Sequence, residues 1–478
     1  MKEFTTEGTL IIVGMVLAYI LFTSWLTWRL RSKTSGEHME GARAMPAFIV
    51  GILLMSEYIG AKSTIGTAQA AFEDGFAASW SVIGAAIGFP IFGLLLVKRI
   101  YNTGKITISG AIAEKYGNTT KCIISLIMIY ALLLVNVGNY VSGAAAISTV
   151  LKVNLPVAAF ITAIVSTFYF AFGGMKGMAW VTMLHSGLKY VGILIILGVA
   201  LKMTGGITPM VEKMPSFYWT WDGNVGASTI FAWLIGTIGS IFCTQFVIQA
   251  ISSTKSPAAA RRATWVAFFF CLPIGLAIAA IGVAAKFLHP EINSLYALPV
   301  FLQDMSPWLA GIVTTSLVAS IFVSVSTVAL AIASLIVKDF YVPMRNPTPE
   351  REFKVTRWLS LAIGFAPLVF VLLVPEVLKL SFFTRAIRLS ISVVAIIAFY
   401  LPMFKSARGA NWGLIGACVM TSVWFVLGDP FGINNMYIAL ITPAVVMVID
   451  RMIPSKESSR KAAHHFRTVE PINDSGNS

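Results

Sequence analysis

Six ionisable side chains lie deep inside stretches of sequence that are otherwise almost entirely apolar. They form three pairs, Glu57 with Lys62, His185 with Lys189, and Arg385 with Arg388. An ionisable group at the centre of a lipid bilayer costs roughly 2.5 to 3.5 kcal/mol, so such groups usually serve ion binding, proton transfer or ligand binding. The positions of these six residues therefore carry more information than the apolar residues around them.

The stretch around the first pair combines glycines with hydroxyl side chains, which makes it poor material for a simple membrane anchor. From residue 51 it reads GILLMSEYIGAKSTIGTAQAAFEDG. Glycine and serine lower the cost of unwinding, and unwound carbonyl groups at the membrane midplane can hold cations. On an unbroken helix Glu57 and Lys62 point about 140° apart, whereas a break near Gly60 brings both into one cavity. The alternative is that Lys62 reaches the membrane surface along its flexible stem.

Two further apolar stretches carry polar centres that complement this one. Residues 227–250 contain Gly236 and Gly239, and paired glycine-broken helices in two halves of a chain are typical of inverted-repeat transporters. Close packing of helices is the alternative explanation for these glycines. Residues 309–335 carry hydroxyl groups at helical spacing, at Ser316, Ser320, Ser324 and Thr327. These hydroxyls can bind a small cation, or they can bond to the carbonyl groups of their own helix.

The second ionisable pair, His185 and Lys189, lies within residues 178–201. Four residues separate the two side chains, so they lie one helical turn apart on the same face. They can act as a proton relay or as a structural hydrogen-bonded pair, and we favour the structural interpretation.

Helices in a membrane must position these residues, because the whole chain has the composition of a membrane protein. Of its 478 residues, 57% are hydrophobic and 12% are charged, against about 25% charged in soluble proteins. A soluble enzyme is therefore excluded, and an aromatic content of 12% argues against disorder. The net charge of +14 does not indicate nucleic-acid binding, because the basic residues fall between the apolar stretches. Four widely spaced cysteines are expected to be reduced packing residues: Cys122, Cys243, Cys271 and Cys418.

Thirteen stretches are long and apolar enough to cross a hydrocarbon core of about 30 Å as helices. They predict an all-α polytopic membrane protein with a transmembrane domain over residues 1–454 and a disordered cytoplasmic tail over residues 455–478. The first stretch lacks a basic leader, so we expect it to be retained as a helix. The predicted spans are 8–28, 47–72, 76–97, 122–149, 157–173, 178–201, 227–250, 264–287, 309–335, 356–374, 379–403, 410–428 and 435–450.

Basic residues predict how the spans are oriented. One set of alternate loops, together with the C-terminal tail, contains 25 lysines and arginines, and the other set contains 6. Cytoplasmic loops of membrane proteins are enriched in these residues. We therefore expect an integral plasma (inner) membrane protein with its N-terminus outside and its C-terminus in the cytoplasm.

Four motifs in order give the chain a resemblance to the sodium:solute symporter family, the family of the sodium-coupled carriers of proline, pantothenate, acetate and galactose. Together the motifs cover about residues 40–345. They are EYIGAKSTIG from Glu57, YFAFGGMKGMAW from Tyr169, QFVIQAISSTKSPAAARRA from Gln245, and VASIFVSVSTVALAIASLIVKDFY, which ends at Asp339 and Tyr341.

The resemblance implies a leucine-transporter-type core, in which residues 47–201 and 227–403 form two inverted repeats of five helices. In the family, sodium is held by backbone oxygens of the broken helix and by oxygens of the ninth span. Carried over to this chain, these ligands are the carbonyl groups near Ser56 and Ile59, an oxygen of Ser320 and the hydroxyl of Ser324. The substrate pocket is expected to be lined by Tyr58, Lys62 and Ser63, with Glu57 beside them and the seventh span opposite.

Three positions depart from the family pattern and bear on the coupling ion. Val323 replaces the first of two adjacent hydroxyl residues, Thr182 replaces a carboxylate, and Lys62 places a positive charge near the expected cation site. Two unit charges about 5 Å apart repel by about 3 kcal/mol at an effective dielectric constant of about 20. We expect a secondary active transporter that carries a small anionic or zwitterionic organic solute by alternating access, with sodium favoured as the coupling ion. A proton-coupled or uncoupled transporter of the same fold is the alternative.

Two other classes of protein fit the sequence less well. A membrane solute sensor built on such a core normally continues into an output domain, and we expect the roughly 25 residues after the last predicted span to be too few for one. An enzyme is not expected, because the sequence has neither paired carboxylates nor an HExxH motif at membrane depth. The expected partners are a small solute and the lipid bilayer, with no nucleic acid and no cofactor besides coupling Na⁺ or H⁺. The oligomeric state is left open.

Overall fold

Long apolar helices make up most of the structure, a computed structural model that describes residues 5–30, 43–170, 174–373 and 377–453. Within these ranges, ten helices are long and apolar enough to cross a membrane, and two bent helix pairs raise the number to twelve. A further apolar helix, α8 (Leu155–Phe170), is shorter. The predicted all-α membrane fold is confirmed, whereas the predicted number of thirteen spans is not. The predicted tail, residues 455–478, lies outside the described residues.

The helices are distributed over the whole described chain, with several short 3₁₀ helices between them. Their bounds are α1 (Thr6–Arg29), α3 (Ala47–Tyr58), α4 (Ala61–Asp74), α5 (Trp80–Leu95), α6 (Val97–Asn102), α7 (Ile108–Leu151), α8, α9 (Gly174–Thr204), α10 (Thr208–Lys213), α11 (Ala227–Cys243), α12 (Gln245–Ser252), α13 (Pro257–Leu288), α14 (Pro307–Leu335), α15 (Val342–Arg345), α16 (Pro349–Phe365), α17 (Val377–Tyr400), α18 (Ala407–Val426) and α19 (Asn435–Met452).

Hydroxyl caps followed by proline mark where three of the long helices begin. Ser256, Ser306 and Thr348 each precede a proline, and each accepts a hydrogen bond from a backbone N–H three residues further on. The side-chain oxygen satisfies an N–H that has no partner inside the helix, while proline in the first turn needs no such partner. These local signals account for the starts of α13, α14 and α16.

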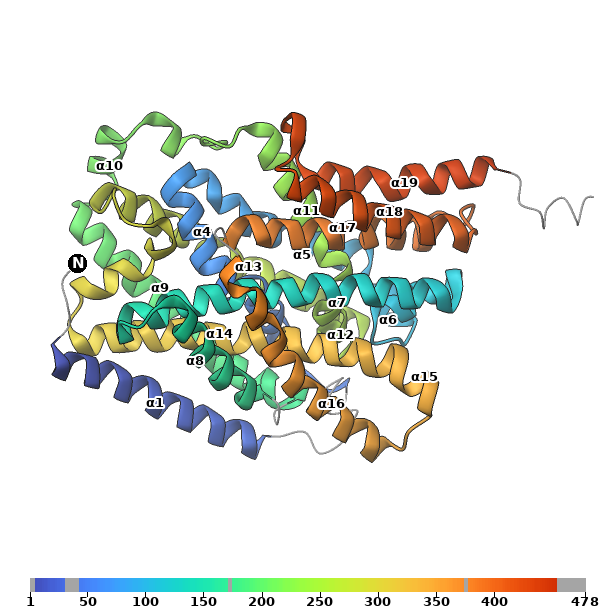
Figure 1. Ribbon diagram of the computed structural model, residues 1–478, viewed down its shortest axis with the longest axis horizontal. Coiled ribbons are helices and arrows are strands. Elements are labelled where there is room, and N and C mark those ends of the chain that lie inside the picture. The colour runs from blue at the N-terminus through green and yellow to red at the C-terminus, as the bar shows by residue number, and fades with distance from the viewer. Residues whose placement is uncertain (1–4, 31–42, 171–173, 374–376, 454–478) are drawn as a thin grey trace, which may run out of the picture.

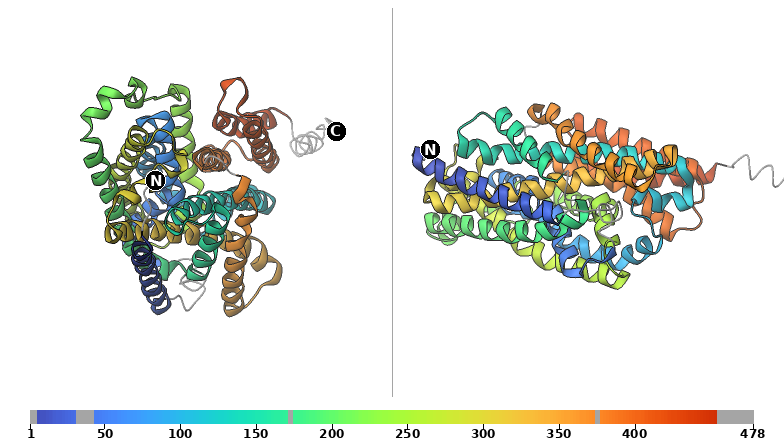
Figure 2. Two further views of the ribbon diagram at one scale, coloured as in Figure 1. Left: turned by 60° about the vertical axis from the view of Figure 1, so that its left-hand side comes forward. Right: turned by 90° about the horizontal axis from the view of Figure 1, so that it is seen from below.

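Helix α14 forms the centre of the fold. Almost all of its residues are buried, because it packs against α7, α9 and α1 (Figure 1). Helix α1 lies along one edge of the molecule, and the pair α18 and α19 lies along the opposite edge (Figure 2). Helix α1 exposes large apolar side chains such as Leu10, Leu21 and Trp28, as expected of a helix that faces lipid.

Two apolar helices are broken near their middle. Helix α3 ends at Tyr58 and α4 begins at Ala61 after a bend of 47°, which confirms the predicted break near Gly60. The second break lies at Thr244, where α11 gives way to α12 at 49°. It does not lie at Gly236 or Gly239, which are both inside α11.

The two glycines of α11 serve close helix packing instead. A side-chain carbon added at Gly236 would overlap Met436, and one added at Gly239 would overlap Leu389. Helices α19 and α17 can therefore approach α11 closely at these positions. The predicted break within residues 227–250 is confirmed, and of the two explanations offered for these glycines the structure favours close packing.

A buried carboxylate joins the end of α14 to the beginning of α7. Asp339 lies in a short π-helix, Ile336–Tyr341, that directly follows α14. It receives four donors from α7 and its N-cap: Thr107 Oγ1 at 3.2 Å, Ser125 Oγ at 2.6 Å, the Ser109 hydroxyl, and Lys121 Nζ in an ion pair of 3.2 Å. Charge-assisted hydrogen bonds of this kind are among the stronger ones in proteins.

Candidate functional site

The predicted cation-binding residues lie together where the broken end of α3 meets α9 and α14. The Ser324 hydroxyl donates to the Ser320 carbonyl oxygen at 2.9 Å. Gly60 lies so close to α14 that a side-chain carbon at this position would overlap the Ser324 oxygen. The Ser56 hydroxyl is hydrogen-bonded with that of Ser186 on α9. The backbone around the first break and the hydroxyl groups of α14 therefore lie next to each other.

An ammonium group from α9 also lies at this site. Lys189 Nζ donates to the carbonyl oxygen of Ile59, one of the predicted cation ligands, at 2.5 Å. The helix ends at Tyr58, so carbonyl groups near its end lack partners within the helix. The Lys189 side chain is 1% exposed. A basic side chain of the protein itself therefore occupies the position beside the Ile59 carbonyl oxygen.

His185, the other member of the predicted proton relay, has its contacts on different helices. Its Nδ1 is hydrogen-bonded with the Tyr19 hydroxyl on α1 at 2.6 Å. The imidazole ring also packs edge-on against Tyr19 and against Phe322 on α14. His185 points toward α1 and Lys189 toward α3, and these contacts favour the structural interpretation of the pair.

Glu57 and Lys62 lie on opposite sides of the first break and make separate contacts. Thr327 Oγ1 on α14 donates to Glu57 Oε2 at 2.5 Å. Lys62 lies against α7, where a side-chain carbon on Gly138 would be 3.6 Å from Lys62 Cβ and Cδ. Lys62 is 7% exposed, so it does not reach the membrane surface. In the described ranges it has neither a hydrogen bond nor an ion pair, including with Glu57.

Several neutral polar atoms near Lys62 are also buried without a partner among the described residues. Asn136 and Asn139 flank Gly138 on α7, and the Asn136 amide nitrogen and Asn139 amide oxygen are unpaired, although the two side chains bond to each other at 3.0 Å. The Ser63 hydroxyl on α4 and the Ser381 hydroxyl on α17 are unpaired as well. A buried unpaired polar atom costs about 1 to 3 kcal/mol. Buried polar atoms without a partner are uncommon in folded proteins, and these lie on α4, α7 and α17.

Tyr58 connects the first helix break to the second. Its hydroxyl is hydrogen-bonded with Ser240 Oγ at 3.1 Å and with Thr244 Oγ1 at 3.2 Å. Thr244, the residue at the second break, also accepts a hydrogen bond from Arg388 Nη1 at 2.8 Å. The two breaks and α17 therefore share one polar network.

Arg385 and Arg388 are members of this site to which the sequence analysis gave no role. Arg385 Nη1 donates to Thr237 Oγ1 at 2.7 Å and to the Ser81 carbonyl oxygen at 3.0 Å. Both arginines are almost fully buried. Their charge at membrane depth was visible in the sequence, but the packing of α17 against α11 was not.

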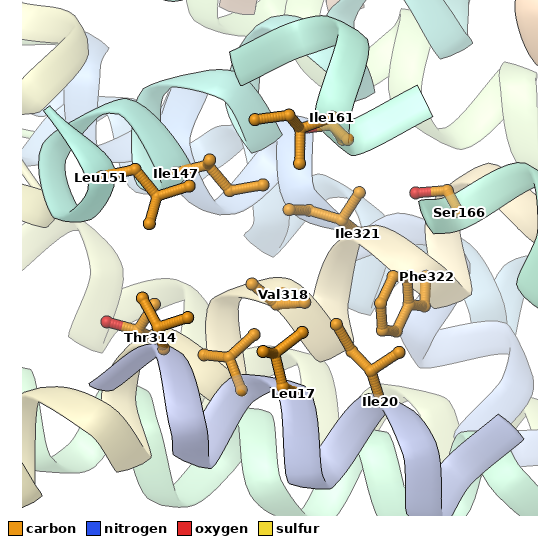
Figure 3. Close-up of a pocket in the computed structure, with 13 residues that line it drawn as sticks. Leu17, Ile20, Ile147, Leu151, Ile161, Ser166, Thr314, Val318, Ile321 and Phe322 are labelled. Carbon is orange, nitrogen blue, oxygen red and sulfur yellow. The ribbon is translucent and has the colours of Figure 1, made fainter. Parts of the chain in front are cut away.

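Two cavities border α14. The larger, of ≈ 120 Å³, lies between α1, α7, α8 and α14, and apolar side chains such as Leu17, Ile147 and Phe322 point into it (Figure 3). Its lining includes none of the predicted site residues, and its apolar character suits a hydrocarbon group better than an ionic solute. The smaller cavity, of ≈ 10 Å³, is bordered by Thr64, Ser142 and Ser320, the last of which is a predicted cation ligand.

The hydrogen bond to Glu57 gives a prediction about stability. Thr327→Val removes the donor at 2.5 Å from a buried carboxylate with little change in side-chain volume. We expect the free energy of unfolding in detergent to fall by about 1 to 3 kcal/mol. Thr327→Ser retains the hydroxyl and should restore most of the loss. A valine variant as stable as the unchanged chain would contradict this role of Thr327.

Comparisons with known proteins agree with this arrangement. The chain is 22% identical to the high affinity choline transporter 1 of Homo sapiens over 378 residues, which are 73% of this chain and 64% of that protein, so the match spans less than two thirds of the relative. It is 22% identical to the uncharacterized symporter YwcA of Bacillus subtilis (strain 168) over 92% of this chain and 90% of that protein.

The fold is similar to that of a solved Na⁺-coupled sialic acid symporter in a substrate-bound outward-open state. The TM-score is 0.80 at 18% sequence identity, over 95% of this chain and 99% of that one. Together with the two bent helices, this likeness confirms the predicted leucine-transporter-type fold. A model of the sodium:solute symporter family matches residues 38–416, most of the chain. The chain is therefore an integral membrane protein that belongs to the sodium:solute symporter family.

Proposed function

We propose that the chain is a secondary active transporter that carries a small organic anion or zwitterion by alternating access, in symport with a cation. Family membership supports solute transport, and the two broken helices support binding near the midplane. The proposal includes the plasma (inner) membrane as location, with the N-terminus outside and the C-terminus in the cytoplasm, as the distribution of basic residues predicts.

The observation that carries the proposed solute class is the buried basic side chain of Lys62. Around the two breaks, the described residues include four buried cationic side chains and one carboxylate, namely Lys62, Lys189, Arg385, Arg388 and Glu57. Three of the cations donate to carbonyl or hydroxyl oxygens, whereas Lys62 has no such acceptor in the described part of the chain. A buried charge without a partner is costly. An anionic group of a solute, such as a carboxylate, can pair with it.

Two coupling ions are candidates. The family description favours sodium, whose expected ligands are the oxygens of Ile59, Ser320 and Ser324. The contact of Lys189 with the Ile59 carbonyl oxygen favours the proton as the second candidate, because a cationic side chain is already present at that oxygen.

Uptake by proteoliposomes tests the proposal. Purified protein is reconstituted and given an inward gradient of either sodium or protons, with a panel of radiolabelled carboxylates and amino acids. We expect accumulation of at least one carboxylate-containing solute above the level in protein-free liposomes, and only with one of the gradients. If the solute only equilibrates across the membrane and neither gradient drives its accumulation, the protein is an uncoupled carrier and the proposed symport is wrong. Lack of uptake for the whole panel would contradict the proposed solute class.

A further inference from the structure

The sodium ion that the family implies does not fit the ligands found at the first helix break. Its expected ligands include the Ile59 carbonyl oxygen, and Lys189 Nζ lies 2.5 Å from that atom. A sodium ion bound to the same oxygen would lie about 5 Å or less from the ammonium, and the repulsion lowers sodium affinity by roughly 100-fold. Both cations cannot be accommodated there at low cost.

We propose that the ammonium of Lys189 is the resident cation of this site, and that no sodium ion binds there while Lys189 is present. The group performs the structural work of the ion, since it holds the unwound end of α3 in contact with α9. Where transport is measured, this inference rests on the proposed function; where cation binding is measured, it stands independently.

The surroundings of Lys189 are built to hold it in this position. Ser186, one turn earlier on α9, is hydrogen-bonded with Ser56 on α3. Gly192, one turn later, lies so close to α14 that a side-chain carbon there would overlap Ser316. Residues three apart lie on the same side of a helix. Lys189 is therefore directed between α3 and α14, which is where the predicted cation ligands meet.

Titratable groups on two neighbouring helices interact electrostatically with Lys189, namely Glu57 on α3 and Cys271 on α13. His185 on the same helix also interacts with it, although its ring contacts Tyr19 on α1. Glu57 in turn is oriented by Thr327 on α14. The Ile59 carbonyl oxygen is thus in direct contact with Lys189 Nζ, and Glu57 interacts with it electrostatically.

Sodium-dependent stabilisation of purified protein tests the proposal without any solute. Anything that binds the folded state raises its stability. We expect the melting temperature of the unchanged chain in detergent to be the same in sodium chloride and in potassium chloride of equal concentration. Lys189→Met removes the ammonium but keeps a similar volume, and its melting temperature should rise in sodium chloride alone. Adding Ser324→Ala to Lys189→Met should remove that rise.

A lysine at the exposed end of the same helix provides the control. Lys202→Met should behave as the unchanged chain does, with no sodium-specific shift. A sodium-specific rise for the unchanged chain that Ser324→Ala abolishes would overturn the proposal, and this result does not depend on whether Lys189→Met folds. Equal melting temperatures of a folded Lys189→Met variant in both salts would overturn it as well.

Uptake measurements separate this inference from the proposed function. If the unchanged chain transports a solute, we expect sodium to change its rate less than twofold, whereas Lys189→Met should gain about tenfold or more from sodium if it remains active. Failure of every solute to be transported would contradict the proposed function and leave the binding result standing. Transport by the unchanged chain that requires sodium, and that loses this requirement in Ser324→Ala, would overturn the inference alone.

Discussion

Uptake by the Lys62→Met variant is expected to fall at least about 30-fold, because loss of one partner from a buried charge pair costs about 2 to 5 kcal/mol. The melting temperature of the variant in detergent is expected to stay the same or rise. The reason is that Lys62 is 7% exposed and has no hydrogen bond or ion pair in the described ranges, so its removal relieves an unpaired buried charge. Initial uptake rates per reconstituted protein and thermal unfolding measure the two effects.

Two variants serve as controls for this result. Lys62→Arg retains the positive charge and should keep part of the uptake, although its shape differs from that of lysine. Lys105→Met makes the same chemical change at an exposed position outside the site and should transport normally. Normal uptake by Lys62→Met would show that Lys62 does not bind the solute. A large drop in its melting temperature would show that Lys62 stabilises the fold and is not an unpaired buried charge.

Arg385→Met, unlike Lys62→Met, is expected to destabilise the protein, with a loss of about 3 kcal/mol or more in the free energy of unfolding. Arg385 donates two hydrogen bonds, to Thr237 Oγ1 and to the Ser81 carbonyl oxygen, and hydrogen bonds to charged groups contribute about 1.5 to 3 kcal/mol each. The guanidinium also lies 5.0 Å from the centre of the Phe382 ring and 5.9 Å from that of Tyr58. Unfolding by SDS titration in mixed micelles measures the change.

Arg385→Lys is the matched variant for this prediction. Lysine keeps the positive charge but has a single donor nitrogen and a different shape. We therefore expect Arg385→Lys to lose about half as much stability as Arg385→Met. If Arg385→Met is as stable as the unchanged chain but fails to transport, then Arg385 binds the solute. The claim that its hydrogen bonds stabilise the fold would then be wrong.

The sequence predicted the first helix break and missed the position of the second for a physical reason. Around Gly60, glycines and hydroxyl residues weaken the helix locally, and this is visible in the sequence. In α11 the helix stays intact at Gly236 and Gly239, where neighbouring helices pack closely. It breaks at Thr244, whose side chain is bonded to Tyr58 and Arg388 from distant parts of the chain. Tertiary contacts of this kind leave no local pattern.

At the predicted cation site, too, the sequence indicated which residues matter but not which distant residues they contact. The resemblance to a family identified Ser320 and Ser324, and the structure brings both to the first break. The contact between Lys189 and Ile59 joins residues 130 positions apart, so the spacing of His185 and Lys189 could suggest a relay but not the actual partner. For the same reason, Arg385 and Arg388 were recognisable as unusual residues while their acceptors were not.

The bonds around Asp339 have a mechanical consequence. A carboxylate held by Thr107, Ser109, Ser125 and Lys121 resists separation of the end of α14 from the start of α7. Sliding of one helix along the other at this end would break several charge-assisted bonds at once. We therefore expect the end of α14 and the first turns of α7 to move together during any rocking of the helices.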